Sequence, residues 1–149
     1  MFTNTLLSEY AQRIIDLGKK EGKIFKEVLD NKVIKDLIVR LNTKEQLEKD
    51  KTDSLGAHLG TYSFATEQMS DGKKKQGQFI DLKDTGEFYA SWKVKVFQRF
   101  ISIDANPIKE KNNLFDDYGE DVLGLTDDNL QILIDETKKL YIEYYRKNL

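Results

Sequence analysis

The sequence predicts an α+β fold, in which a small antiparallel β-sheet packs against N-terminal and C-terminal helices, with long polar loops between them. Three observations predict it. Apolar residues recur at helical spacing in the first third of the chain and again at its end. In the middle, apolar and polar residues alternate with the period of a half-buried strand. Runs rich in Gly, Ser, Asp and Lys separate these segments, so helices and strands are segregated along the chain, as in α+β domains.

The composition of the chain excludes several classes of function. The 149 residues suit a single domain, 1–149, and 11% aromatic residues argue against disorder even though 34% of residues are charged. A net charge of -2 offers no attraction to anionic surfaces, so we expect no membrane binding and no specific nucleic-acid binding. The absence of Cys excludes thiol nucleophiles and thiolate zinc sites, and a single His excludes multi-His metal sites. We therefore expect no cofactor and no metal.

The N-terminal region, 1–48, is predicted to be helical. One amphipathic helix is expected over residues 3–18 and a second over 23–48. The second is interrupted by Asp30-Asn31, residues that favour a kink or a helix restart because their side chains compete for backbone hydrogen bonds.

Two long polar segments have the composition of loops. Residues 49–78, called the arm below, contain few apolar residues and much turn chemistry, and residues 106–125 form a second polar loop. Loops of this length are uncommon inside compact domains and are usually functional or disordered. We expect the arm to be an extended segment or an interface loop.

Residues 79–105 are predicted to form the strands. From Phe88 to Val96 apolar residues alternate with polar ones, and Phe100 to Ile103 supply the returning strand. An alternative for the start of this segment is a short helix over 86–91, because Asp84 and Thr85 are good helix caps.

The C-terminal helix is expected over 126–148, capped by Thr126. Its predicted apolar face comprises Leu130, Leu133, Ile134, Thr137, Tyr141 and Tyr144. We expect the sheet to pack on this helix, with Trp92, Val94 and Val96 against Leu130, Leu133 and Ile134.

Residues with catalytic potential are isolated. His58 lies in a Gly-rich segment without a partner, which favours a solvated loop histidine over a general base. Lys73-Lys74-Lys75 is a short run that favours a solvated loop over a phosphate site. Paired acidic residues, at 116–117, 120–121 and 127–128, match no calcium loop and favour solvated loops and helix N-termini. No catalytic set emerges.

Six segments, taken in order, carry a resemblance to a known family. They are Arg40–Leu47, Asp53–Gly56, Leu59–Tyr62, Leu82–Trp92 with its Asp-Thr-Gly turn, Tyr118-Gly119, and Val122–Leu130 with its Leu-Gly-Leu-Thr element. Their order and spacing resemble the tail-completion, or virion-morphogenesis, class of head–tail connector and minor tail proteins of tailed phages.

The resemblance implies a structural protein of the bacteriophage virion rather than an enzyme, assembled in the host cytoplasm at the head–tail connector, the neck or the tail end. It implies a homo-oligomeric ring whose partners are other connector, portal or tail proteins. The motif positions are expected to specify architecture or interfaces: Asp84, Thr85, Gly86, Ser91, Trp92, Tyr118, Gly119, Leu123, Gly124, Leu125 and Thr126.

Several of these positions have a local physical role. Gly86 permits a positive φ, and Ser91 can bond to backbone where helix changes to strand. Leu123 and Leu125 can pack under the sheet on either side of Gly124.

Two other functions stay open at the level of sequence. One is a small metal-dependent hydrolase or nuclease using carboxylates such as Asp84, Glu87 and Asp104. The other is a non-viral binding domain with the same α+β fold.

Overall fold

The computed structural model describes residues 12–13, 16, 19–98 and 100–148. The α+β class is confirmed, with two small antiparallel sheets of two strands each instead of one sheet. The helix predicted over 3–18 lies outside the described residues except at positions 12, 13 and 16, which are helical.

The helical first third is interrupted where the sequence predicts. Helix α2 spans Glu21–Leu29, and α3 spans Lys32–Arg40. Asn31 caps α3, because its side-chain oxygen accepts a hydrogen bond from the Ile34 N–H at 2.9 Å. The chain then continues without a break into η1, a π-helix over Leu41–Asp50.

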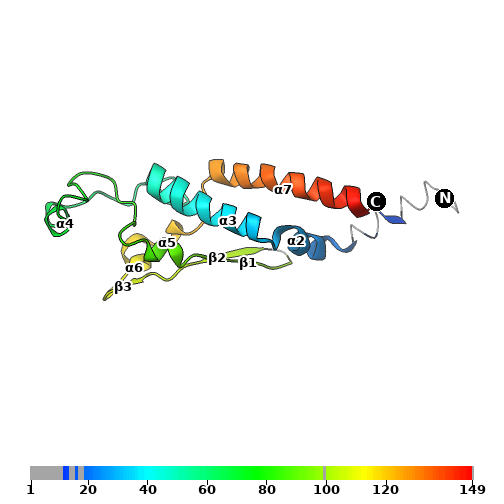
Figure 1. Ribbon diagram of the computed structural model, residues 1–149, viewed down its shortest axis with the longest axis horizontal. Helices are drawn as coiled ribbons and strands as arrows, with labels where there is room; N and C mark the ends of the chain where they lie inside the picture. Colours follow the sequence, from blue (N-terminus) through cyan, green and yellow to red (C-terminus); the bar gives the residue numbers. More distant parts are fainter. Residues whose placement is uncertain (1–11, 14–15, 17–18, 99, 149) are drawn as a thin grey trace.

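Helix α7, Asp127–Asn148, runs antiparallel to α2 and α3 and contacts both (Figure 1). Strands β1, Lys93–Val96, and β2, Ile101–Asp104, form a hairpin on the other side of α3. The body of the molecule is therefore three elements deep, with α3 in the middle. A second, two-residue hairpin joins β3, Ile108–Lys109, to β4, Asn112–Asn113.

The larger apolar cluster lies where these three elements meet. It joins Ile24, Val28, Leu29, Ile34, Ile38 and Leu41 from the helical first third to Val94 and Val96 of β1 and Leu133 of α7. The prediction that Trp92, Val94 and Val96 pack on Leu130, Leu133 and Ile134 is confirmed only for Val94, Val96 and Leu133. It is wrong for Trp92, which lies in a second cluster. Leu130 and Ile134 are 43% and 36% exposed, because α7 turns its Leu133 side inward and these residues lie on its flank.

A smaller apolar cluster surrounds the buried Trp92. Leu47 and Ala105 complete its buried centre, and Phe88, Phe115 and Leu123 pack around it. The Phe88 ring meets the Trp92 ring edge-on at a centroid distance of 5.7 Å. This cluster ties η1 to the β1–β2 hairpin at the end of the body from which the arm departs.

Two buried amide side chains join η1 to the segment before α7. Asn42 Nδ2 donates to the Val122 carbonyl at 3.0 Å, and Asn42 Oδ1 accepts from the Gly124 N–H at 2.7 Å. One turn later, Gln46 Nε2 donates to the Gly124 carbonyl at 2.9 Å, and Gln46 Oε1 accepts from the Thr126 N–H at 2.8 Å. Each amide thus binds the extended backbone as a neighbouring strand would.

The helix that carries these two amides, η1, is a π-helix. Within η1 the Thr43 hydroxyl donates to the Val39 carbonyl at 2.7 Å, competing for an acceptor of the backbone ladder where the wider turns begin. Positions 42 and 46 are about one turn apart in η1, so both amides reach the same segment. Gly124 is required opposite them, because its φ is +112° and an added Cβ would lie 3.2 Å from the Ser54 Cβ.

The segments expected as loops contain short helices. The arm carries α4, Phe64–Met69, started by the Ser63 hydroxyl, which accepts from the Thr66 N–H. The second polar loop contains β3, β4, α6 over Leu114–Tyr118 and the 3-10 turn η2 over Glu120–Val122. The sequence did not predict these elements because they are too short to show a periodic apolar pattern. Their capping residues are also common in turns.

The start of the predicted strand region is also helical. Residues Phe88 and Ala90 lie in α5, Glu87–Ala90, and not in a strand, so the alternative of a short helix is confirmed. Gly86, with φ of +89°, precedes α5. None of the described helices is long and apolar enough to cross a membrane.

We predict that Gln46→Ala lowers the free energy of unfolding by about 1–3 kcal/mol, because it removes the side-chain partner of two partly buried backbone groups, the Gly124 carbonyl and the Thr126 N–H. Urea unfolding measures this. Lys44→Ala, on the exposed side of η1, is the matched control and should cost less than about 0.5 kcal/mol. Equal costs for the two variants would contradict the structural role of Gln46.

Candidate functional site

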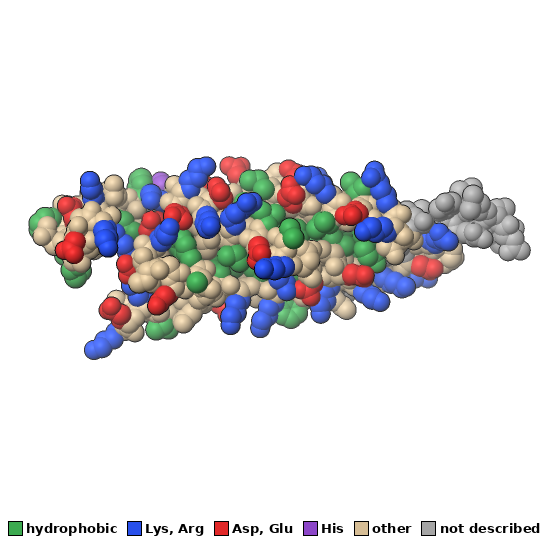
Figure 2. Space-filling view, viewed as in Figure 1, with side chains coloured by type: hydrophobic (Ala, Val, Ile, Leu, Met, Phe, Trp, Pro, Cys, Tyr) green, Lys and Arg blue, Asp and Glu red, His purple; other side chains and the backbone are tan. Residues whose placement is uncertain are grey.

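The candidate site is a cleft between the arm and the β3–β4 hairpin, at the end of the molecule that carries α4 (Figures 1 and 2). It consists of two adjoining hollows of about 240 Å³ and about 610 Å³. The residues that line both are Tyr62, Lys74, Ile80, Asp84, Lys109, Glu110, Leu114 and Tyr118. The cleft thus has an apolar floor and a rim of both charge signs.

The two limbs of the arm, the second continued as far as Ile80, pair with each other beside the cleft. The Tyr62 N–H donates to the Gln78 carbonyl at 2.9 Å, and the Ile80 N–H donates to the Gly60 carbonyl at 3.0 Å. Near the tip, Glu67 Oε2 accepts from the Gln76 N–H at 2.7 Å. The arm is therefore an ordered projection, held by its own hydrogen bonds.

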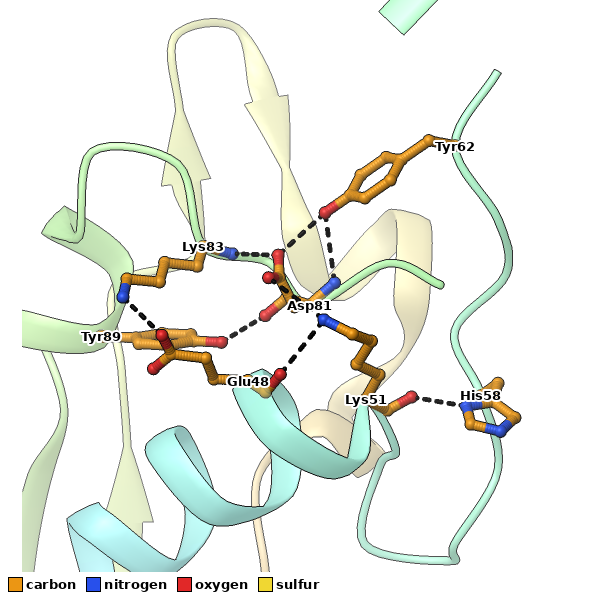
Figure 3. Close-up of polar contacts among 7 residues, drawn as sticks. All are labelled: Glu48, Lys51, His58, Tyr62, Asp81, Lys83 and Tyr89. Carbon is orange, nitrogen blue, oxygen red and sulfur yellow. Dashed lines mark hydrogen bonds and ion pairs between the residues drawn. The ribbon is translucent and has the colours of Figure 1, made fainter. Parts of the chain in front are cut away.

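Asp81 holds the base of the arm (Figure 3). Its Oδ1 accepts from the Tyr62 hydroxyl at 2.8 Å, its Oδ2 lies 3.7 Å from Lys51 Nζ, and its carbonyl accepts from the Tyr89 hydroxyl. Burial raises the pKa of Tyr62 to about 12, so this phenol stays protonated and available as a donor. Lys83 adds an ion pair to Glu48 of η1 at 2.5 Å. One carboxylate therefore links the end of η1, the arm and α5.

Asp84 lies on the rim of the cleft, where it bridges the arm and the β3–β4 hairpin. It pairs with Lys109 of β3 and lies 4.0 Å from Lys74 of the arm. The hydrogen bond from Lys109 holds the pKa of the Asp84 carboxyl below its usual value. Lys74 also lies over the Tyr62 ring, 5.4 Å from its centroid, so the lysine run is only partly a solvated loop.

The remaining motif residues have structural partners. Thr85 Oγ1 accepts from the Glu87 N–H at 3.3 Å. The Ser91 hydroxyl donates to the Phe88 carbonyl at 2.6 Å and accepts from the Asn106 N–H at 2.9 Å, so it ties the end of α5 to the end of β2. Tyr118 lines the cleft, and Gly119 ends α6 with φ of +83°.

The Leu-Gly-Leu-Thr element joins both apolar clusters to α7. Leu123 packs in the Trp92 cluster and Leu125 in the larger one. Thr126 Oγ1 accepts from the Asn129 N–H at 3.4 Å, in the position of the predicted cap. The expected motif positions therefore divide into two places: the rim of the cleft near Asp84, and the body near Trp92.

Sequence reasoning missed three residues that organise these places: Asn42, Gln46 and Asp81. Asn42 and Gln46 fall within a motif segment, but their partners are about 80 residues away along the chain. Asp81 stands between Ile80 and Leu82 and has no local signature. Only the spacing of the two amides on one side of a helix could have indicated a shared partner.

The isolated polar residues of the described chain have separate local partners. His58 is exposed, and its Nδ1 lies 2.8 Å from the Lys51 carbonyl oxygen. Its ring stacks on the Phe79 ring with a distance of 3.7 Å between the ring centroids. Among the described residues, no three His, Asp or Glu side chains gather as metal ligands. Asp84 is paired with lysines, and Asp104 accepts from the neighbouring Ala105 N–H. The acidic pairs lie in the first turns of α6, η2 and α7.

We predict that Asp81→Ala loosens the arm without unfolding the body, because Asp81 contacts the arm base and the larger core does not depend on it. Hydrogen exchange should accelerate at the Tyr62 and Ile80 amides and stay unchanged in β1. Asp36→Ala, an exposed carboxylate on α3, is the control. Unchanged exchange at Tyr62 and Ile80 would show that Asp81 does not hold the arm.

Comparison with known proteins finds no matching family model, no matching curated protein and no matching solved structure.

Proposed function

We propose that the chain is a structural protein of a tailed-phage particle, which assembles as a ring at the head–tail connector, the neck or the tail end. Its partners are further copies of itself and neighbouring portal, connector or tail proteins. The chain works through interfaces and not through chemistry on a substrate.

The observation that carries this proposal is the apolar tip of the arm. Helix α4 projects beyond the body (Figure 1), and its Phe64 and Met69 are 59% and 80% exposed. Neither side chain belongs to an apolar cluster of the described chain. Large apolar and aromatic side chains of this kind are typical of the centres of protein interfaces.

The base of the arm supports the same function. The paired limbs and the contacts of Asp81 hold the arm in one direction before any partner binds. An ordered arm loses less conformational entropy on association than a flexible loop, so more of the contact energy contributes to affinity. The cleft beside the arm base supplies a second concave surface of mixed charge.

The motif residues fit an architectural function. Asn42 and Gln46, in the first resembling segment, bind the backbone of the Leu-Gly-Leu-Thr element in the last. The resembling segments thus explain how the body is built around the arm. Of the other two functions, the hydrolase gains no specific observation. The exposed apolar tip also suits a non-viral binding domain, and the presence of the chain in purified particles separates that function from the proposal.

The experiment measures mass by light scattering for the chain alone and mixed with a portal-proximal protein of the same particle. We expect a monomer or weak oligomer alone and a ring of defined mass in the mixture. Purified particles should contain the chain. A chain that stays monomeric in the mixture and is absent from particles would overturn the proposal. Incubation with Mg²⁺ and nucleic acid tests the hydrolase, which predicts cleavage.

A further inference from the structure

The β1–β2 hairpin has an exposed outer face. Val94 and Val96 of β1 are buried in the larger apolar cluster. Because successive side chains of a strand point to opposite faces, Lys93 and Lys95 point away from that cluster, and both are exposed. Figure 2 shows Lys and Arg side chains projecting from the lower margin of the molecule, below the place where Figure 1 draws the hairpin. One face of the hairpin therefore builds the core, while the other meets solvent.

Two stacked aromatic rings stand at the tip of the hairpin. The Phe97 N–H donates to the Phe100 carbonyl at 2.9 Å, and the two ring centroids are 4.7 Å apart. Phe97 continues the alternation of Lys93 and Lys95, so the rings belong to the same outer face. Phe97 and Phe100 are 42% and 58% exposed. Exposed aromatic side chains of this kind are typical of the centres of protein interfaces.

The outer face is positively charged towards the tip. The register places Ser102 opposite Lys95 and Asp104 opposite Lys93, so the hairpin carries a carboxylate at its base and none nearer its tip. From residue 88 to residue 103 the sequence contains no Asp or Glu. Neither lysine makes an ion pair with any described residue. Such a face fits a partner surface that is both apolar and acidic.

The start of α2 adjoins the tip and adds to this positive charge. A Cβ added at Gly22 would lie 3.3 Å from the Gln98 Cβ, so the two elements touch. Lys19 and Glu21 line one hollow with Gln98 and have opposite charges. Over residues 19–26, however, the sequence carries four Lys and one Glu. The surroundings of the tip are therefore cationic as a whole.

The start of α7 borders a hollow with the complementary chemistry. This hollow of about 540 Å³ is lined by Asp50, Asp127, Asp128 and Leu55 among others, and all of its charged lining residues are carboxylates. Leu55 is 76% exposed. The three carboxylates form no ion pair with described residues, and the two lysines that flank Asp50 in sequence pair with other carboxylates. Residues 112–137 contain eight Asp and Glu and no Lys or Arg. We call this surface the acidic hollow.

The two surfaces of one copy lie on opposite sides of its body. Helix α7, which borders the acidic hollow, lies on one side of α3, and the hairpin lies on the other side (Figure 1). The hairpin of a copy therefore does not reach the acidic hollow of the same copy. One copy can instead hold one neighbour at its hairpin and another at its hollow.

We propose that the outer face of the hairpin in one copy docks on the acidic hollow of a second copy. Phe97 and Phe100 cover Leu55, while Lys93 and Lys95 face the carboxylates of the hollow. The contact is heterologous, because two different surfaces meet, and repetition of such a contact gives a closed ring when the rotation between copies fits. The inference rests on the proposed assembly and names the surfaces by which copies meet.

Cross-linking tests this contact, and the cysteine-free chain gives no background. The full-length Phe100→Cys chain is mixed at high concentration with the full-length Leu55→Cys chain and treated with a short bis-maleimide. A tag on one chain separates the mixed product by mass. The matched control replaces Leu55→Cys by Val33→Cys, because Leu55 and Val33 are both 76% exposed. We expect the 100–55 product to exceed the 100–33 product about tenfold, as for a contact that needs one specific orientation. Equal yields overturn the proposal.

A charge exchange identifies the surfaces independently. Lys93→Glu with Lys95→Glu on the Phe100→Cys chain should lower the 100–55 yield about tenfold, because like charges then face each other. Asp50→Lys with Asp128→Lys on the Leu55→Cys chain should restore it. Lys73→Glu with Lys75→Glu on the Phe100→Cys chain is the matched control, since these exposed lysines lie in the arm, and it should leave the yield unchanged.

The outcomes separate this inference from the proposed function. Failure of restoration, with both reversed chains folded, overturns the docking of these two surfaces. If light scattering with the portal-proximal protein still gives a ring, the assembly stands and another contact forms it. If the cross-link is specific but no ring forms and particles lack the chain, the docking stands and the proposed function fails. If neither experiment detects association, both proposals fail.

Discussion

The structure depends on two buried amides that bind a distant stretch of backbone. Asn42 and Gln46 each donate to and accept from the segment that ends at Thr126, about 80 residues later in the chain. Because a buried backbone group without a partner is costly, these bonds fix the path of an otherwise irregular segment. That path places Leu123 beside Trp92 and starts α7 against α3. The two apolar clusters therefore share one polar connection.

The same end of the body holds the arm. Helix η1 presents the amides on one side. Glu48 in its last turn and Lys51, the residue after its end, reach the arm base. Asp81 then connects Lys51 to Tyr62 and Tyr89. The direction of the arm is thus coupled to the packing of the body through a continuous set of polar contacts. An arm held in this way can present an apolar tip without burying it in its own core.

Much of the fold could be predicted because its signals are local. The break at 30–31, the cap at Thr126 and the positive φ of Gly86 follow from capping chemistry and glycine geometry within a few residues. The roles of Gln46 and Asp81 could not be predicted, because their hydrogen-bond partners are distant in sequence. The helical spacing of apolar residues also gave a wrong prediction on α7. This spacing is the same whether the fold covers an apolar stripe or leaves it exposed, and Leu130 and Ile134 are exposed.

The account makes the arm the functional element of the molecule, and its central claim is that the arm tip becomes buried on assembly. The most direct test is hydrogen–deuterium exchange at residues 64–77, compared between the free chain and the chain in its ring. The account predicts slower exchange there in the ring, with the amides of α3 unchanged, because the tip is covered while the body keeps its packing. Equal exchange of the tip in both states would contradict the account.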